Sequence, residues 1–247
     1  MSVTDHDTVA GLADARRAAE GARVKFVDGV EITAVHDGRD VHILGYFIDT
    51  ADDAFKSFLA EQRARRVARV REIGARLASL GAGVDVDHLL TRAVQRPGAS
   101  VGRAAIARAL VRARQASSVQ DAFERFLAAG RPAFVPRTGK APSEVVRIIH
   151  AAGGLASMAH PGVTNQPAVM AALVAAGLDA IEVFHSDHSP QTQRDLQAFA
   201  AEHDLLLTGG SDHHGDDSRD RPLGRATLPA SEFARLEQRK AREKSRS

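Results

Sequence analysis

The spacing of apolar positions changes twice along the chain, and these changes predict three regions of different structure. In the first region, up to about residue 50, short apolar runs rich in β-branched residues predict strands. The dipeptide Asp37-Gly38 separates two of these runs and favours a tight hairpin turn. The elements expected in this region are a helix at 8–20, capped by Thr8, and strands at 24–27, 30–35 and 41–47.

The second region has helical periodicity throughout. Apolar residues recur at intervals of three and four from Phe55 to Leu77, which predicts one long helix that ends near Gly81. Further helices are expected at 85–95, 103–114 and 119–129. Because this stretch is all-α in pattern, we expect residues 51–136 to form a helical insertion.

After Pro136 the pattern alternates between helix-like and strand-like segments. Helices are expected at 143–152, 167–176 and 191–202, and strands at 155–159, 180–184 and 205–208. This alternation is typical of parallel strands joined by helical crossovers, as in an α/β barrel. The expected division is an α/β domain in two parts, 1–50 and 137–230, around the insertion, followed at 231–247 by a C-terminal helix and a charged tail that frays from Arg239.

Composition removes several classes of function. The 247 residues include no Cys, which excludes disulfides, thiolate metal sites and cysteine nucleophiles. Aromatic residues make up only 4%, which argues against a platform that stacks nucleic-acid bases. The first ten residues do not resemble a signal peptide, and no apolar segment approaches the roughly 20 residues that span a bilayer. We therefore expect a cytoplasmic protein without a membrane association.

The 11 His residues are a high count, and several of them follow expected strands. In α/β barrels the functional site lies at the carboxyl ends of the strands. Four strand ends deliver His or Asp to this face: Asp5 and His6, His160, His185, and Asp212 with His214.

His nitrogen and carboxylate oxygen are ligands that suit Zn, Mn and Fe. Two or three such ions close together can clamp a phosphate and activate water, and Glu31 is the natural carboxylate to bridge them. Each residue alone also has an ordinary interpretation. His6 can belong to a helix cap, and Glu31 and His42 can be solvent-facing strand residues.

Five polar clusters, taken in chain order, resemble the pattern of the PHP (polymerase and histidinol phosphatase) family. The clusters are Thr4-Asp5-His6-Asp7, Gly29-Val30-Glu31-Ile32, His42-Ile43-Leu44-Gly45, Ala159-His160-Pro161 and Gly210-Ser211-Asp212-His213-His214-Gly215. The helical insertion after the His42 strand, with Gly102-Arg103 at a helix start, is similar to the nucleoside 3′,5′-bisphosphate phosphatase branch. The resemblance spans almost the whole chain.

This resemblance implies a PHP-type distorted (β/α) barrel with an inserted all-α subdomain. It implies a metal-dependent phosphoesterase in which metal-activated hydroxide removes a phosphate from a nucleotide, either a nucleoside 3′,5′-bisphosphate or a short RNA 5′ end. The cofactors implied are divalent metal ions, with Mn first and Zn, Fe or Mg as the alternatives. The implied metal ligands are His6, Glu31, His42, His160, Asp212 and His214.

Among these residues, Glu31 and His160 are the implied catalytic pair, and Arg103 and His185 are the candidates for binding substrate. A guanidinium group forks onto two phosphate oxygens, although a helix-start Arg is as often simply solvated. His188 is more often a loop residue. The implied partner is the nucleotide itself or a short RNA, and no obligate protein partner is indicated.

The family also carries an Asp-Leu-His-x-His-Ser motif on its first strand, and this sequence contains none. We therefore expect an N-terminally truncated barrel, either from a misplaced start codon or in an impaired copy. Two alternative functions remain open: a non-catalytic remnant that binds metal or nucleotide, and a histidinol phosphatase-like hydrolase.

Arginines are frequent on the long helix expected in the insertion, and they raise the separate question of RNA binding. Such a charge run is usually the solvated face of its helix, and no aromatic residues interleave with it here. The residues are Arg63, Arg65, Arg66, Arg69 and Arg71.

Overall fold

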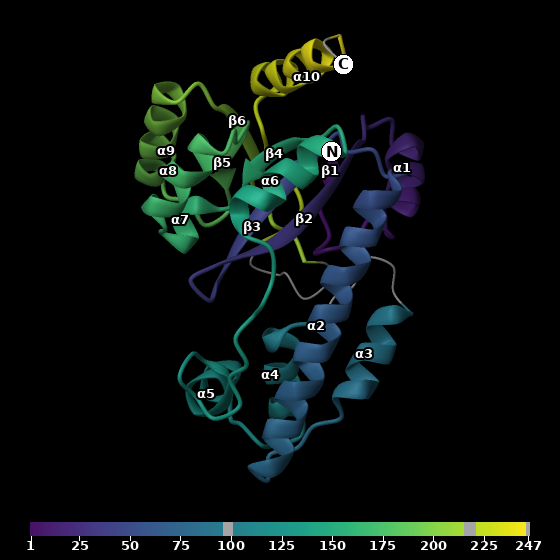
Figure 1. Ribbon diagram of the computed structural model, residues 1–247, viewed down its shortest axis with the longest axis vertical. Helices are drawn as coiled ribbons and strands as arrows, with labels where there is room; N and C mark the ends of the chain where they lie inside the picture. The colour runs from purple at the N-terminus through teal and green to yellow at the C-terminus, as the bar shows by residue number, and fades with distance from the viewer. Residues whose placement is uncertain (96–100, 215–220, 246–247) are drawn as a thin grey trace.

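Six strands form one sheet in which they lie side by side in the order of the chain (Figure 1). The strands are β1 (Ser2–Val3), β2 (Val27–His36), β3 (Arg39–Tyr46), β4 (Leu155–Met158), β5 (Ala180–His185) and β6 (Leu206–Gly210). The pairs β1–β2, β4–β5 and β5–β6 are parallel, whereas β3 is antiparallel to both of its neighbours. The computed structural model describes residues 1–95, 101–214 and 221–245, so Gly215 and the last two residues of the predicted tail lie outside it. The predicted α/β class with a distorted barrel is confirmed.

The hairpin between β2 and β3 forms where the sequence predicts it. Asp37 and Gly38 have φ angles of 48° and 72°, so both occupy the left-handed region that a two-residue hairpin turn requires. His36 pairs with Arg39 on either side of this turn. The register that follows places His42 opposite Thr33, so the candidate site residues Glu31 and His42 lie two residues apart along the strand pair and on the same face.

Helix α1 (Leu12–Gly21) begins later than predicted, and Gly11 rather than Thr8 is its N-cap. The Thr8 hydroxyl instead accepts a hydrogen bond from the amide of Ala10 at 3.2 Å. The predicted cap is therefore wrong, because this hydroxyl is used in a turn that precedes the helix.

The separate strand predicted at 24–27 is also wrong, since only Val27 belongs to a strand. The amide of Val24 donates to the carbonyl of Ala19 at 2.8 Å and so closes the end of helix α1. Arg23 before it has a φ of 57°, which turns the chain back towards the sheet. The β-branched residue thus serves the helix end rather than the sheet.

Helices occupy the stretch after β3. They are α2 (Asp53–Ser79), α3 (Val86–Val94), α4 (Arg103–Arg112), α5 (Val119–Ala122) and the π-helical turn η1 (Phe123–Leu127). Asp52 caps α2, because its carboxylate accepts from the amide of Phe55 at 2.6 Å. This block has an apolar core of its own that includes Ile73, Leu77, Ile106 and Leu110. Figure 1 shows α3, α4 and α5 gathered beside the far end of α2, away from the sheet.

The single helix predicted at 119–129 is divided in the structure. After α5 the chain widens into η1, and the amide of Ala128 donates to the carbonyl of Phe123, five residues earlier, at 2.9 Å. Phe126 and Leu127 of this turn are buried in the core of the helical block. The wider turn therefore orients apolar side chains that a regular helix would place differently.

The remaining helices belong to the α/β part. They are α6 (Pro142–Ala151), α7 (Pro161–Thr164), α8 (Pro167–Ala175), α9 (Pro190–Glu202) and α10 (Ala230–Lys244). The main core lies between these helices and the sheet, and it includes Ile32, Ile43, Ile149, Met158 and Ile181. The short helix α7 was not predicted. No helix in the described part of the chain is long and apolar enough to cross a membrane.

Helix α10 continues to Lys244, so the fraying predicted from Arg239 is wrong for the described residues. Leu236 is buried in a small cluster against β4 and β6, and Glu237 forms an ion pair with Lys25. Arg239 lies 3.9 Å from the carboxylate of Asp179. These contacts stabilise α10, whose charged sequence alone predicted a frayed end.

Candidate metal centre

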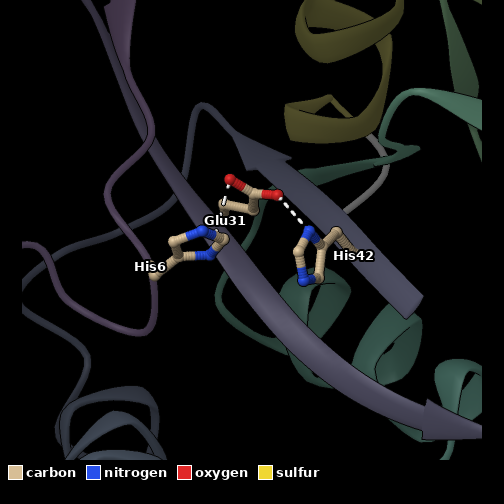
Figure 2. Close-up of side chains that lie close together, drawn as sticks. All are labelled: His6, Glu31 and His42. Carbon is tan, nitrogen blue, oxygen red and sulfur yellow. Dashed lines mark ion pairs between the residues drawn. The ribbon is translucent and has the colours of Figure 1, made fainter. Parts of the chain in front are cut away.

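The predicted residues of the first half of the chain meet beside β2. The segment after β1 runs along this strand, because the amide of Glu31 donates to the carbonyl of Asp5 at 3.1 Å and the amide of Asp7 donates to the carbonyl of Glu31 at 2.8 Å. His6 therefore lies opposite Glu31 in an isolated parallel bridge. His42 projects towards the same carboxylate from β3 (Figure 2).

Glu31 lies at the centre of this cluster, in contact with three imidazoles. Its Oε1 atom lies 2.7 Å from Nδ1 of His42 and 3.5 Å from Nε2 of His160. Its Oε2 atom lies 3.5 Å from Nδ1 of His6. The ligand atoms of His6, Glu31 and His42 all lie within 4.8 Å of one another. Because the two carboxylate oxygens face different imidazoles, the arrangement suits a carboxylate shared between two ligand groups.

The charge states of the cluster follow from burial and from this contact. Burial opposes ionisation of Glu31, but His6, His160 and His42 outweigh it and hold the pKa of this carboxyl well below its usual range. Burial lowers the pKa of His6 to about 4, so this imidazole is neutral at pH 7. A neutral imidazole and an ionised carboxylate are the forms in which both groups bind metal ions.

Imidazole rings extend the cluster to the ends of two further strands, β4 and β5. His42 and His160 have ring centroids 5.2 Å apart, and Nδ1 of His42 lies 3.2 Å from Nε2 of His160. His160 and His185 follow at 5.7 Å, and His6 lies 4.9 Å from His42 on the other side. Side chains that are far apart in sequence thus form one continuous row.

Some buried imidazole nitrogens of the site are free of hydrogen bonds, and this observation tests whether the residues suit a metal ion. Nδ1 of His6, Nδ1 of His160 and Nε2 of His185 are all buried and have no hydrogen-bond partner among the residues that the structure describes. Such groups normally have a partner, because an unsatisfied buried polar atom costs about 1–3 kcal/mol. A divalent metal ion accepts imidazole nitrogen and carboxylate oxygen, so the donor set fits it.

A second group of predicted residues gathers after β6. Nε2 of His185 lies 3.5 Å from Oδ2 of Asp212, and Nδ1 of His214 lies 3.6 Å from Oδ1 of the same carboxylate. Asp212 also forms an ion pair with Arg221, a residue that the sequence analysis did not identify. Nothing in the sequence around Arg221 distinguishes it from its charged neighbours, so only the fold identifies it.

His188 differs from the other imidazoles of the row. Its Nδ1 atom lies 2.9 Å from the carbonyl of Val183, and its Nε2 atom accepts from the amide of Gly162 at 3.2 Å. Both ring nitrogens are therefore used by the backbone. His188 therefore links the turn after β5 to the start of α7 by hydrogen bonds, which supports the interpretation of His188 as a loop residue.

Glu182 is a buried acid of this site that the sequence analysis missed. Its Oε2 atom accepts a hydrogen bond from the amide of His160 at 2.8 Å, and burial raises the pKa of this carboxyl to about 7. His160 has a φ of 30°, a left-handed conformation that a side-chain-bearing residue adopts only when its surroundings hold it. The available signal was a lone carboxylate inside the apolar strand β5.

We expect Glu182→Ala to lower kcat/KM for phosphate-ester hydrolysis by about 10–100-fold, as for other groups that orient ligands. Glu182→Gln should retain most of the activity, since its amide oxygen can accept the same bond from His160. Equal losses in both variants would contradict a positioning role. Melting temperatures of the two variants separate that outcome from general unfolding.

Arg103 begins helix α4, and its guanidinium group lies 5.5 Å from the ring of Phe134 and 6.0 Å from that of Phe123. Within the described residues, no hydrogen bond or ion pair joins it to Glu31 or the row of imidazoles. It contributes instead to the electrostatic surroundings of Arg69 and Arg137.

Comparison with known proteins adds independent observations to this geometry. No protein-family model matches the chain. The 5′-3′ exoribonuclease Rnm of Escherichia coli is 34% identical over 223 residues, which cover 87% of this chain and 74% of that protein. The 3′,5′-nucleoside bisphosphate phosphatase of Chromobacterium violaceum is 31% identical over 229 residues, covering 91% of this chain and 80% of its own length.

A solved structure is similar over nearly the whole chain. It is a Bifidobacterium adolescentis protein described as a metal-dependent phosphoesterase, with a TM-score of 0.83 and 32% sequence identity. The match covers 96% of this chain and 85% of that structure. The similarity therefore includes both the sheet that carries the Glu31 cluster and the helical block.

Proposed function

Because the chain belongs to the PHP family of metal-dependent phosphoesterases, we propose that it hydrolyses a phosphomonoester of a nucleotide. The substrate class proposed is nucleoside 3′,5′-bisphosphates, with short RNA 5′ ends as the second class. The observation that carries the proposal is the ionised Glu31 carboxylate, which lies within 3.5 Å of the imidazoles of His6, His42 and His160.

The residues proposed to hold divalent metal ions offer imidazole nitrogen or carboxylate oxygen atoms. They are His6, Glu31, His42, His160, Asp212 and His214. We propose Mn²⁺ as the ion, with Zn²⁺, Fe²⁺ or Mg²⁺ as alternatives. When bound, such ions would polarise the phosphoryl oxygens and activate water for attack on phosphorus.

The chain's own residues contribute orientation and charge. Glu31 fixes the rings around it, and we assign it with His160 as the catalytic pair because the two groups contact each other. Glu182 holds His160 through its backbone amide. His185 and Arg103 are proposed to contact the substrate, His185 from the carboxyl end of β5 and Arg103 from the start of α4.

The relatives support this choice of substrate. One of them is named for a nucleoside bisphosphate and another for RNA, and both names describe hydrolysis of phosphate esters that a nucleotide carries. A site that positions one phosphate beside Glu31 serves either substrate. Selectivity between the bisphosphate and RNA must then depend on contacts between the protein and the rest of the substrate.

A substrate panel tests the proposal. The full chain loaded with Mn²⁺ is assayed for released phosphate from adenosine 3′,5′-bisphosphate, AMP, a 5′-phosphorylated oligoribonucleotide and histidinol phosphate, with products identified by mass spectrometry. We expect the highest kcat/KM with the bisphosphate. Absence of hydrolysis of every nucleotide by metal-loaded protein would sink the proposal, and preference for histidinol phosphate would replace it.

A further inference from the structure

Arg221 joins two carboxylates that follow neighbouring strands. Its Nη1 atom pairs with Asp212 after β6, and its Nη2 atom pairs with Asp187 in the loop after β5. A guanidinium group is planar and offers its donors in a fixed fork, so it can hold two carboxylates in a defined arrangement. Arg221 therefore connects the loop that carries Asp212 to the loop that directly follows His185.

The backbone around Arg221 is bonded to the same loop after β6. The carbonyl of Arg221 accepts a hydrogen bond from Nδ1 of His213 at 2.9 Å. The hydroxyl of Ser211 accepts from the amide of Gly224 at 2.9 Å and donates to the carbonyl of Ala226 at 3.2 Å. These bonds reach the residues on both sides of the proposed metal ligand. The Arg221 side chain therefore starts from a defined point beside that ligand.

The loop after β5 gives Asp187 a defined position as well. The amide of Asp187 donates to Nδ1 of His185 at 3.1 Å, and the hydroxyl of Ser186 donates to the carbonyl of Ser211 at 2.9 Å. His185 itself lies at the end of β5 and is almost wholly buried. The carboxylate that anchors Arg221 thus belongs to a loop that is bonded to the ends of both strands.

The Asp212 carboxylate depends on Arg221 for its orientation. Its Oδ2 atom lies 3.5 Å from Nε2 of His185, and its Oδ1 atom lies 3.6 Å from Nδ1 of His214. Both distances exceed those of ordinary hydrogen bonds. Asp212 also has a left-handed φ of 48°, a conformation that its surroundings must hold. Among the described residues, Arg221 makes the shortest contact with this carboxylate.

Charge decides whether Arg221 supports or opposes a cation at Asp212. An uncompensated guanidinium beside the ligand would repel a metal ion. Asp187 compensates it, so the group of two carboxylates and one guanidinium keeps one net negative charge. A cation is therefore still attracted to the group, and the larger contribution of Arg221 is to hold the ligand oxygens in place.

We propose that Arg221, anchored by Asp187, is a positioning residue that orients the Asp212 carboxylate for a divalent metal ion. The inference rests on the proposed function and adds to it two residues that lie outside the proposed ligand set. Groups that hydrogen-bond to a metal ligand fix its orientation, and their loss weakens metal binding. Arg221 thus acts on the ion through Asp212.

Titration of metal-stripped full-length protein with Mn²⁺ tests this role without any measurement of activity. Calorimetry gives the affinity for each ion in the wild type, and the reference variant Asp212→Asn shows which binding events need that ligand. Arg221→Gln should weaken those same events by about 10–100-fold. Asp187→Asn should weaken them too, because Arg221 then loses both its anchor and its compensating charge.

Two further variants and a kinetic measurement separate positioning from a general structural effect. Arg235→Gln removes a guanidinium from an exposed ion pair with Glu232 on α10, and it should leave Mn²⁺ affinity unchanged. Arg221→Lys keeps the charge but lacks the planar fork, so its affinity should lie between those of wild type and Arg221→Gln. Saturating Mn²⁺ should return kcat of Arg221→Gln close to the wild-type value, which would not happen if the substitution damaged the fold.

The outcomes distinguish this proposal from the proposed function. Unchanged Mn²⁺ affinity in Arg221→Gln overturns it, and so does tighter binding, which would mean that Arg221 repels the ion. Equal weakening by Arg235→Gln overturns it as a general effect of charge. Should Arg221→Gln lack a cooperative melting transition, Arg221→Lys and Asp187→Asn decide the question in the same titration. Mn²⁺ binding that depends on Arg221 in a protein that hydrolyses no nucleotide supports the positioning role and sinks the phosphatase.

Discussion

The Glu31→Gln substitution is expected to reduce phosphate-ester hydrolysis by at least about 10³-fold, because a bound metal ion contributes several kcal/mol to such reactions and each 1.36 kcal/mol is tenfold in rate. Glutamine keeps the size of the side chain and loses the charge. The three imidazoles around Glu31 would then face a neutral amide, whose NH₂ group must point towards one of them. Metal affinity should fall together with activity.

Elemental analysis of purified protein and steady-state kinetics check this prediction together. The matched control is Glu61→Gln, which removes the same charge from an exposed ion pair on α2. Glu31→Gln protein that retains full metal content and near-normal kcat would remove Glu31 from the centre of the mechanism. A loss of activity shared by the control would point to a general effect of charge.

Local sequence rules predicted most of the fold, since the information lies within single elements. The hairpin at Asp37-Gly38 needs two residues that tolerate positive φ, and α2 needs Asp52 and a long apolar stripe. The failures occurred where tertiary contacts override the local signal. Val24 closes a helix despite its β-branched side chain, and η1 widens to bury Phe126 and Leu127.

The sequence predicted those residues of the candidate site that directly follow strands. His160, His185 and Asp212 follow parallel strands directly, so the chain order alone places them on one face. Glu31 and His42 lie within an antiparallel hairpin, so strand ends did not place them; ligand chemistry suggested Glu31, and the resemblance to a family supplied the pair. The structure shows why they meet: His42 lies opposite Thr33, two residues from Glu31 on the same face of β2, and the Glu31 side chain reaches His42 at 2.7 Å.

The sequence alone could not identify residues that act by positioning other residues. Glu182 supports His160 through a backbone amide, so its role depends on a contact 22 residues away in the chain. Arg66 and Arg69 of α2 turn inward, whereas Arg65 and Arg71 on the same helix pair at the surface. Helical periodicity shows which residues share a face of a helix. It does not show which polar face packs against another part of the protein.

The pair Asp7–Arg66 links the two parts of the protein at this point. Asp7 directly follows His6, with a left-handed φ of 54°, and Arg66 is on the long helix that carries the helical block. Any change in the angle of α2 would therefore be transmitted to the segment that holds His6. The Asp7–Arg66 pair therefore joins α2 directly to the segment that carries His6 into the candidate metal centre.

Removal of divalent ions with a chelator is expected to abolish hydrolysis and to lower the melting temperature. An ion that binds only the folded chain stabilises it by RT ln(1 + [L]/Kd), about 2.7 kcal/mol at an ion concentration of 100 Kd. For a chain of this size, each kcal/mol corresponds to roughly 2–4 °C. The physical source of that stability is the set of buried imidazole nitrogens on His6, His160 and His185, which accept or donate no hydrogen bond within the described part of the chain.

The same titration with Glu31→Gln distinguishes a specific centre from adventitious ions. If the ions act at the Glu31 cluster, adding Mn²⁺ to stripped wild-type protein raises the melting temperature and restores hydrolysis over the same concentration range. The variant should show neither effect, because the glutamine side chain carries no negative charge with which to bind the ion. A thermal shift of equal size in wild type and variant would place the stabilising ions elsewhere on the protein. Hydrolysis that survives complete removal of metal would contradict the assignment of these residues as a metal centre, because the proposed chemistry takes its electrophile from the bound ion.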